Sequence, residues 1–245
     1  MKIKENWQEE FFIDGWDFLQ DVFLPPERAV EEINFIDRFA KEKGYLKVLD
    51  IPCGTGRISL PLAEKGYDVT GIDFNPNVIK LAKERSGDKK VEFLQGDMRE
   101  ITYKEEFDLI SCMWGSIGYF SDDEDFNFFR ASHDALRPGG AMIIDTFTLE
   151  IIMRIYSQMD ARKFESGYLI EDREYDLRNS RINVEWTYIS EEKKFKIHSS
   201  IRLYTYKELL DMLQKAGFKE FLPFGGFNDE KFSINSRRLE LIAIK

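Results

Sequence analysis

Three acidic residues and two glycines in the first half of the chain have the types and spacing of a nucleoside-binding site. Asp50 ends an apolar run, and Gly54 and Gly56 follow it. Asp73 ends a second apolar run, and Asp97 follows a third. Glycines let the backbone approach a ligand closely, and a helix that starts after them presents free N–H groups and positive potential. A carboxylate at the second position can accept hydrogen bonds from both hydroxyls of an adenosine ribose.

These residues are positioned by an alternation of predicted strands and helices. Short apolar runs predict the strands, and amphipathic segments between them predict the helices. Asn75-Pro76 begins one helix, and a capping box at Ser121 and Glu124 begins another. Repeated strand–helix units predict a parallel sheet that is covered on both faces. The predicted strands cover residues 46–51, 68–73, 91–95, 107–112 and 141–145, the first helix covers 57–65, and residues 137–140 form a turn before the fifth strand.

Residues 164–204 interrupt this alternation with runs of period two, which predict antiparallel strands. Residues 168–170, 174–177, 182–189 and 194–204 are the candidate strands. A second capping box, Thr205 and Glu208, begins a helix that ends at Gly217, and two edge strands, 218–224 and 239–244, follow. The predicted fold class is α/β, a Rossmann-like, seven-stranded, mostly parallel sheet with helices on both faces and an inserted antiparallel β lobe. Its predicted regions are an N-terminal segment (1–44), a core (45–163 and 205–245) and an insertion (164–204).

The N-terminal segment is rich in aromatic residues between positions 5 and 24. Trp7, Phe11 and Phe18 fit a helical stripe, which indicates a helix packed on the domain. The alternative is that these aromatic side chains form a lid over a ligand. Pro25-Pro26 predicts the start of a second helix, which ends near Gly44.

Composition narrows the classes of function. Across 245 residues, 45 acidic side chains against 35 basic ones give a formal net charge of −10, which disfavours DNA as a partner. Two cysteines and two histidines provide no metal-spaced cluster, so no metal is predicted. No run reaches the roughly 20 apolar residues of a membrane span, and the first residues lack the apolar run of a signal peptide. We therefore expect a cytoplasmic protein that does not bind a membrane.

The glycine turn is compatible with two kinds of ligand. The nicotinamide dinucleotide fingerprint requires Gly-x-Gly-x-x-Gly, but Ser59 occupies the third position. An acid at Asp50 is unfavourable beside a pyrophosphate. It suits a ligand that carries an ammonium and a sulfonium and no phosphate.

Several motifs in order resemble the class I S-adenosylmethionine-dependent methyltransferases. The segment 50–56 resembles the first motif of that family, and 71–74 the second, with Asp73 as ribose ligand. The turn 96–98 resembles the adenine site, with Asp97 on the exocyclic amine, and 136–140 resembles the turn before the fifth strand. The resemblance implies S-adenosylmethionine as methyl donor, S-adenosylhomocysteine as product, and a methyltransferase of class EC 2.1.1.-. The residues it assigns to the donor are Asp50, Pro52, Cys53, Gly54, Thr55, Gly56, Arg57, Asp73, Phe74, Asn75, Gly96, Asp97, Met98, Met113 and Trp114.

The acceptor is expected beyond the carboxyl ends of the fourth and fifth strands, where open α/β sheets bind ligands. Residues 113–120 lie there and resemble the Ser-Ile-Gly-Tyr run of sugar-amine N,N-dimethyltransferases. Period-two alternation places His198, Ser200, Arg202 and Tyr204 on one face of the last strand of the insertion. That face could bind substrate, or be a solvated surface or a dimer contact. The catalytic candidates are His198 and Tyr119, and the substrate-binding candidates are Trp114, Ser116, Tyr119, Arg202 and Tyr204.

The favoured function is in-line transfer of a methyl group to nitrogen or oxygen of a small molecule. Ser111–Trp114 lacks the Asn/Asp-Pro-Pro-aromatic signature of DNA adenine methyltransferases. The alternatives are an RNA or protein methyltransferase, an NAD(P)-binding oxidoreductase and a non-catalytic S-adenosylmethionine-binding protein. A homodimer through the insertion is a further expectation.

Overall fold

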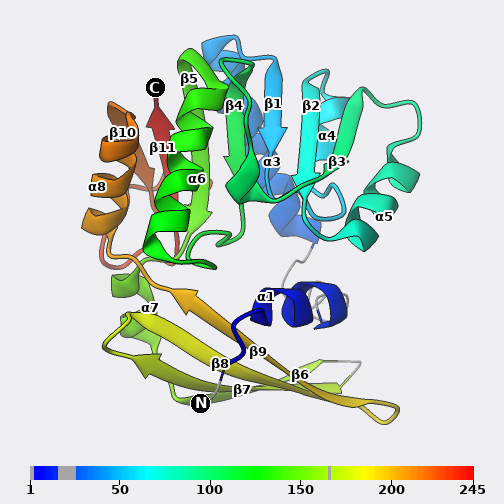
Figure 1. The fold of residues 1–245 in the computed structure, drawn as a ribbon, viewed down its shortest axis with the longest axis vertical. Helices are drawn as coiled ribbons and strands as arrows, with labels where there is room; N and C mark the ends of the chain where they lie inside the picture. Colours follow the sequence, from blue (N-terminus) through cyan, green and yellow to red (C-terminus); the bar gives the residue numbers. More distant parts are fainter. Residues whose placement is uncertain (1–2, 16–25, 165–166) are drawn as a thin grey trace.

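A seven-stranded sheet forms the centre of the fold (Figure 1). The structure is a computed structural model that describes residues 3–15, 26–164 and 167–245. The strand order is β10-β11-β5-β4-β1-β2-β3, and only the β10–β11 and β11–β5 pairs are antiparallel. This confirms the predicted fold class. The strands are β1 Lys47–Asp50, β2 Asp68–Asp73, β3 Val91–Gln95, β4 Phe107–Cys112, β5 Leu136–Thr146, β10 Glu220–Phe224 and β11 Leu239–Ile244.

Helices cover both faces of this main sheet because its central strands are apolar on both sides. Every residue of β4 is buried. One apolar cluster packs α6 and α8 on one face, and a second packs α3 and α4 on the other. The capping boxes at Ser121 and Thr205 form as predicted, and Asn75 caps α5. The helices are α3 Pro26–Lys43, α4 Ser59–Glu64, α5 Pro76–Ser86, α6 Asp122–Ala135, α7 Leu149–Ile155 and α8 Tyr206–Ala216, with a short 3₁₀ helix, η2 Met98–Glu100.

The predicted turn at residues 137–140 is wrong in detail, because β5 already begins at Leu136. Leu136 pairs with Phe107, and the register then shifts so that Ala141 pairs with Leu109. The glycine-rich segment is therefore an irregular stretch within the strand.

A second, four-stranded antiparallel sheet lies against the carboxyl ends of the main strands (Figure 1). We call it sheet B. It begins with β6, a strand that the period-two pattern did not predict. Residues 168–170 and 174–177 were expected as two strands, but residues 167–176 form one long strand because β7 pairs with β8 without interruption, and Leu177 lies in the turn that follows. The strands are β6 Met159–Phe164, β7 Gly167–Asp176, β8 Arg181–Ile189 and β9 Lys194–Arg202.

The N-terminal segment lies between the two sheets (Figure 1). It forms a short helix, α1 Trp7–Glu9, that continues as a π-helical segment, η1 Glu10–Gly15. Trp7 and Phe11 pack in an apolar cluster with Leu169, Tyr188 and Ile197 of sheet B. The rest of the predicted aromatic segment, 16–24, and Pro25 lie outside the described residues. Within the described ranges, no helix is long and apolar enough to cross a membrane.

Candidate functional site

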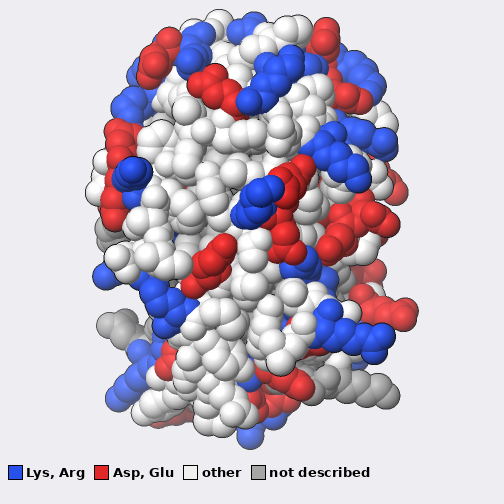
Figure 2. Space-filling view, turned by 90° about the vertical axis from the view of Figure 1, so that its left-hand side faces the viewer, with Lys and Arg blue, Asp and Glu red and all other residues white. Residues whose placement is uncertain are grey.

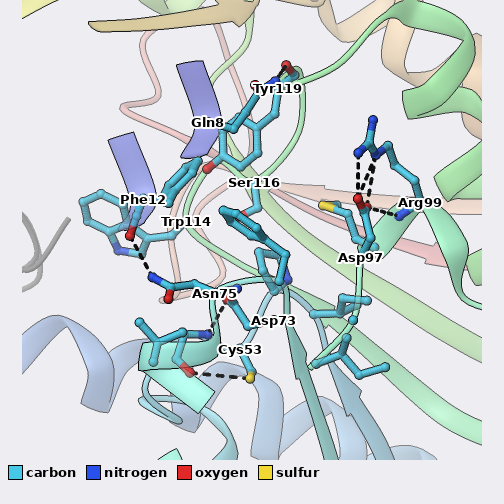
Figure 3. Close-up of a pocket in the computed structure, with 18 of the residues that line it drawn as sticks. Gln8, Phe12, Cys53, Asp73, Asn75, Asp97, Arg99, Trp114, Ser116 and Tyr119 are labelled. Atoms are coloured by element: carbon cyan, nitrogen blue, oxygen red, sulfur yellow. Dashed lines mark hydrogen bonds and ion pairs between the residues drawn. The ribbon is translucent and has the colours of Figure 1, made fainter. Parts of the chain in front are cut away.

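A cavity of about 1080 Å³ lies where the carboxyl ends of β1, β2 and β4 face the N-terminal segment (Figure 3). All fifteen residues that the sequence assigned to the donor line it. Three of the substrate candidates, Trp114, Ser116 and Tyr119, line it as well. Ligand pockets commonly measure about 300–1,000 Å³. This cavity can therefore hold a nucleoside-sized donor together with a small second molecule.

Asp73, at the end of β2, is the central carboxylate of the cavity (Figure 3). Its Oδ2 accepts a hydrogen bond from the Gly54 amide at 2.9 Å, and its Oδ1 accepts one from the Asn75 amide at 2.9 Å. Burial raises the pKa of Asp73, although these amides oppose the shift. Each carboxylate oxygen keeps one lone pair free for a ligand. The geometry suits a pair of ribose hydroxyls.

The turn between β1 and α4 needs glycines because of their positive φ angles and, at one position, for lack of space. Gly56 has φ +83°, and a Cβ there would lie 2.8 Å from Cζ of Phe93. Gly54 has φ +53° and open space around it. The helix that was expected from residue 57 begins at Ser59 and has six residues, because the turn is still closed by bonds such as Gly56 amide to Cys53 carbonyl at 3.0 Å. The turn itself, more than a helix end, forms the wall of the cavity.

Asp50 is a buried carboxylate at the end of β1 with 1% exposure. The Ser59 hydroxyl donates a hydrogen bond to its Oδ2 at 2.5 Å. This explains why a small polar residue replaces the third glycine of a dinucleotide turn. Burial raises the pKa of Asp50 to about 6, although the Ser59 hydroxyl and the charge of Arg57 oppose the shift, and no described residue forms an ion pair with it within 4.0 Å. A cationic ligand group would stabilise the charge of Asp50.

Asp97 lies in the cavity wall, so its role toward an adenine amine stays a prediction, and its carboxylate is also bound within the protein. Its carboxylate forms an ion pair with Arg99 at 2.6 Å and accepts the Arg99 amide at 2.9 Å (Figure 3). Burial raises the pKa of Asp97, but the hydrogen bonds and charge of Arg99 outweigh it and leave the pKa below its usual value. Asp97 lines the cavity, yet its carboxylate is already bound to a guanidinium. Met98, which is buried beside it, keeps the predicted position in the wall.

The segment 113–120, which we call the acceptor loop, forms another part of the wall. Trp114 has φ +68°, an uncommon conformation for a residue with a side chain. Its amide donates to Oδ2 of Asp145 at 2.9 Å, and the guanidinium groups of Arg28 and Arg238 lie over its ring at 4.9 and 5.6 Å. The ring is thus held firmly in the cavity wall.

Tyr119 lies among aromatic side chains at the top of the cavity in Figure 3. Its ring centroid is 5.1 Å from that of Phe12 and 5.9 Å from that of Trp7. Burial raises the pKa of Tyr119 well above its usual value. The phenol is therefore neutral near pH 7 and can orient a ligand, but it is not poised to act as a base.

His198 does not reach the cavity. Ser200, two residues along β9, lines the cavity, whereas His198 is outside the lining. The Nε2 of His198 lies 3.3 Å from Oε2 of Glu185, its cross-strand partner, and Lys196 contacts the same carboxylate. His198 and Ser200 lie on the same face of β9, as the period-two pattern predicts, but β9 extends beyond the cavity and only Ser200 lines it. The structure thus gives no support to His198 as the acceptor-side base.

Arg202 and Tyr204 are also outside the cavity lining. Arg202 forms ion pairs with Asp122 at 3.1 Å and with Glu208 at 2.9 Å. The Tyr204 hydroxyl donates to Asp125 at 2.8 Å. These bonds tie the end of sheet B to α6 and α8, so both residues have structural partners in place of the predicted substrate.

The structure adds residues that the sequence did not assign. Gln8 and Phe12 line the cavity, which favours the lid interpretation of the N-terminal segment over simple packing. The amide nitrogen of Gln8 donates to the Tyr119 carbonyl at 2.8 Å, and the Asn75 side chain donates to the Phe12 carbonyl at 2.8 Å (Figure 3). Arg181 of β8 also lines the cavity. The aromatic content of the segment was the only signal in the sequence for any of these residues.

Comparison with known families identifies the segment that carries the glycine turn. Residues 48–140 match the family model of a methyltransferase domain. A putative methyltransferase, YqeM, of Bacillus subtilis is 28% identical over 214 residues, which is 84% of this chain and 85% of the relative.

Solved structures share the whole fold. An S-adenosylmethionine-dependent methyltransferase from Clostridium acetobutylicum superposes with a TM-score of 0.82 at 16% identity and covers 94% of this chain and 96% of its own. CalS10, an amino pentose methyltransferase from Micromonospora echinaspora solved with S-adenosylmethionine bound, has a TM-score of 0.68 at 20% identity and covers 89% and 90%. The predicted resemblance to this family is confirmed.

Proposed function

We propose that this chain, whose residues 48–140 form a methyltransferase domain, transfers a methyl group from S-adenosylmethionine to an amine of a small molecule. The observation that carries the proposal is the pair of buried carboxylates, Asp50 and Asp73, in one cavity. Neither forms an ion pair with another described residue. A donor with an ammonium group and ribose hydroxyls matches this pair, whereas a pyrophosphate would be repelled by it.

The two carboxylates support separate contacts with the donor. Asp73 would accept hydrogen bonds from the ribose, because both of its oxygens are oriented by backbone amides. Asp50 would attract the ammonium group of the methionine part, because burial penalises its unpaired charge. The donor supplies an activated methyl group on a positively charged sulfur. The protein aligns that group with the acceptor and excludes water.

The transfer step requires little acid–base chemistry when the acceptor is a neutral amine. The nitrogen lone pair forms the new N–C bond as the C–S bond breaks, and the electron pair of that bond stays on sulfur. The resulting ammonium product then loses a proton to solvent. An oxygen nucleophile would gain from a base in the site. Tyr119 is a neutral phenol, and His198 is paired with Glu185 outside the cavity. These positions support nitrogen as the acceptor atom.

A small acceptor is supported by the cover over the site. Gln8 and Phe12 of the N-terminal segment line the cavity on the side of sheet B. An RNA or protein chain would need an open groove past this segment. On the face shown in Figure 2, basic and acidic side chains alternate, without an extended basic surface for a nucleic-acid backbone. The amino pentose methyltransferase with the same fold makes an aminated sugar a suitable first acceptor to test.

The first experiment measures donor binding. Calorimetry with S-adenosylmethionine and S-adenosylhomocysteine should show binding of both, and NADH should neither bind nor compete. Binding of NADH without either sulfur ligand would favour the oxidoreductase alternative and overturn the proposal.

The second experiment measures transfer of a labelled methyl group to a panel of amino sugars, glycine and a catechol, with a protein extract and RNA as further acceptors. We expect label on an amine. Label on catechol oxygen, RNA or protein alone would contradict the proposed acceptor class. Donor binding without any transfer from the panel or extract would favour a non-catalytic binding protein.

A homodimer through sheet B is also our proposal, and the five exposed residues of the edge strand β6 support it. Analytical ultracentrifugation distinguishes dimer from monomer directly. A monomer at micromolar concentration would refute it.

A further inference from the structure

Arg181, the first residue of β8, connects sheet B to the acceptor loop. We propose that Arg181 is the positioning residue of that loop, so that the insertion sets the acceptor site through Tyr119 without binding the acceptor itself. The inference rests on the proposed function for what the loop does, but the placement of Arg181 is independent of it.

All three guanidinium nitrogens of Arg181 are used within the protein. Nη1 donates to the Phe120 carbonyl at 2.8 Å. Nη2 donates to the carbonyls of Gly118 at 3.2 Å and Tyr119 at 3.3 Å, and to the Ser200 carbonyl at 2.6 Å. Nε donates to the Ser200 hydroxyl at 2.9 Å. One planar group therefore fixes three consecutive carbonyls of the loop against β9.

Placing the Arg181 guanidinium here costs desolvation free energy. The guanidinium forms no ion pair within 4.0 Å with a carboxylate of the described residues. The charges of Asp125 and Asp122 favour it from further away, and five carbonyl and hydroxyl contacts hold it directly. Burial of a charge without an ion-pair partner is unfavourable. A surface arginine or a buried apolar residue would hold the two strands of a sheet together at lower cost. What the guanidinium adds is a rigid fork that can hold several acceptors in one plane, which a lysine cannot do.

Two other contacts restrict the same loop. The Arg202 amide donates to the Gly118 carbonyl at 2.8 Å, and Gly118 packs so closely that a Cβ would lie 2.2 Å from the Arg202 carbonyl oxygen. On the opposite side, Gln8 donates to the Tyr119 carbonyl that Arg181 also contacts. The Tyr119 carbonyl is thus the point where the lid, the core and the insertion meet.

It follows that Arg181 aligns the acceptor site without binding the acceptor. Since every guanidinium nitrogen is occupied, Arg181 acts on the acceptor through the position of Tyr119. Loss of this clamp should displace the Tyr119 ring from the cavity wall while the donor turn stays intact, because Gly54, Asp50 and Asp73 make no contact with Arg181.

The experiment compares Arg181→Lys with Arg173→Lys. Arg173 is a matched control because it is also a half-buried arginine of sheet B, but its guanidinium contacts Glu171 and the Ser157 carbonyl at 3.2 Å. Fluorotyrosine at position 119 reports the position of the ring by ¹⁹F NMR. Calorimetry with S-adenosylhomocysteine reports the donor site. Methyl transfer to the panel amine that the unmodified protein uses best reports alignment.

We expect Arg181→Lys to shift or broaden the ¹⁹F signal, to keep the S-adenosylhomocysteine Kd within threefold, and to lower kcat/KM for the amine about 10- to 100-fold, the loss typical of a small misplacement. Arg173→Lys should change none of the three. An unshifted ¹⁹F signal in folded Arg181→Lys would overturn the inference, even if transfer is lost. Should Arg181→Lys fail to fold, Arg181→Gln replaces it, because a glutamine is too short to reach all three carbonyls, and an unshifted signal there also counts against the inference. If the unmodified protein transfers no methyl group to any acceptor but Arg181→Lys still shifts the ¹⁹F signal, the proposed function is refuted and the placement of Tyr119 by Arg181 stands.

Discussion

The donor side and the acceptor side of the cavity are built in different ways. On the donor side, Asp73 accepts amides from Gly54, 19 residues away, and from Asn75, two residues away. On the acceptor side, the Tyr119 carbonyl accepts from Gln8, 111 residues away, and the Phe120 carbonyl accepts from Arg181, 61 residues away. The first side consists of neighbouring strand ends, and the second is assembled from three regions.

Because of this difference, the two sides of the cavity should respond differently to substitutions. Parallel strands bring their carboxyl ends to one edge, so the donor residues meet whenever the sheet forms. The acceptor loop starts at the end of β4, but its far part, residues 118–120, depends on contacts from the N-terminal segment and sheet B. A change in sheet B should therefore reach the acceptor and leave the donor site unchanged. Four predictions test this separation, from the largest expected effect to the smallest.

Replacement of the central carboxylate should give the largest effect. In the proposed donor site, Asp73→Ala would remove two charge-assisted contacts to the ribose, each worth about 1.5–3 kcal/mol, so we expect S-adenosylhomocysteine to bind about 100-fold or more weakly in calorimetry. Asp68→Ala is the control, because Asp68 is an exposed acid at the opposite end of the same strand. Equal affinities for the two variants would show that β2 does not carry the donor site.

Gly118→Ala should damage the acceptor side alone. The new Cβ would meet the Arg202 carbonyl, and φ +90° disfavours a side chain. We expect a 10- to 100-fold loss of methyl transfer with donor affinity retained. Gly139→Ala has a similar φ of +76° without a neighbour within 4 Å, so it separates backbone strain from the clash. A parallel loss of donor affinity in Gly118→Ala would break the separation of the two sides.

Donor affinity should depend on pH through Asp50, whose pKa is raised to about 6 by burial. Above pH 6 the carboxylate is charged and attracts the donor ammonium. As pH falls through 6 it is protonated, so affinity should fall by up to about tenfold per pH unit. In the free protein the sign is opposite, because the raised pKa makes this group most favourable to folding at low pH. Calorimetry from pH 5 to 8 measures the dependence, and Asp50→Asn should remove it. A pH-independent Kd for the unmodified protein would exclude Asp50 as the ammonium partner.

His198→Ala should have the smallest effect. The imidazole contacts Glu185 and lies outside the cavity, so kcat/KM should change less than about twofold across pH 6–9. Lys196→Ala removes the other partner of Glu185 and serves as the control for the surface pair. A rise of the apparent pKa of turnover, or a loss above tenfold in His198→Ala alone, would restore the histidine as a base.

Most of the fold could be predicted because its signals are local. The limits of β2, β3, β4 and β11 follow apolar runs, and the caps at Asn75, Ser121 and Thr205 follow from side chains that bond within three residues. The start of sheet B could not be predicted in the same way. β6 is an edge strand with exposed side chains, so it has no apolar period.

The acceptor side shows the limit of pattern reasoning. Period two correctly places His198, Ser200 and Arg202 on one face of β9, but it cannot tell how far along the strand the cavity extends. Arg181 carries no motif, and its role follows only from the loop it meets. Asp97 has the expected position, but the sequence did not predict its ion pair with Arg99.

The sequence by itself determined the sheet, the glycine turn and the two carboxylates on which the proposed donor site depends, because strand periodicity and the order of strand ends place Asp50 and Asp73 together in any fold of this class. Only the tertiary structure decided the acceptor side. Its geometry depends on where a separate sheet and the N-terminal segment pack, and such long-range packing leaves no period or spacing in the chain. Three features depend on such packing. They are the position of the N-terminal segment at the cavity, the pairing of His198 with Glu185, and the contacts of Arg181 with the acceptor loop.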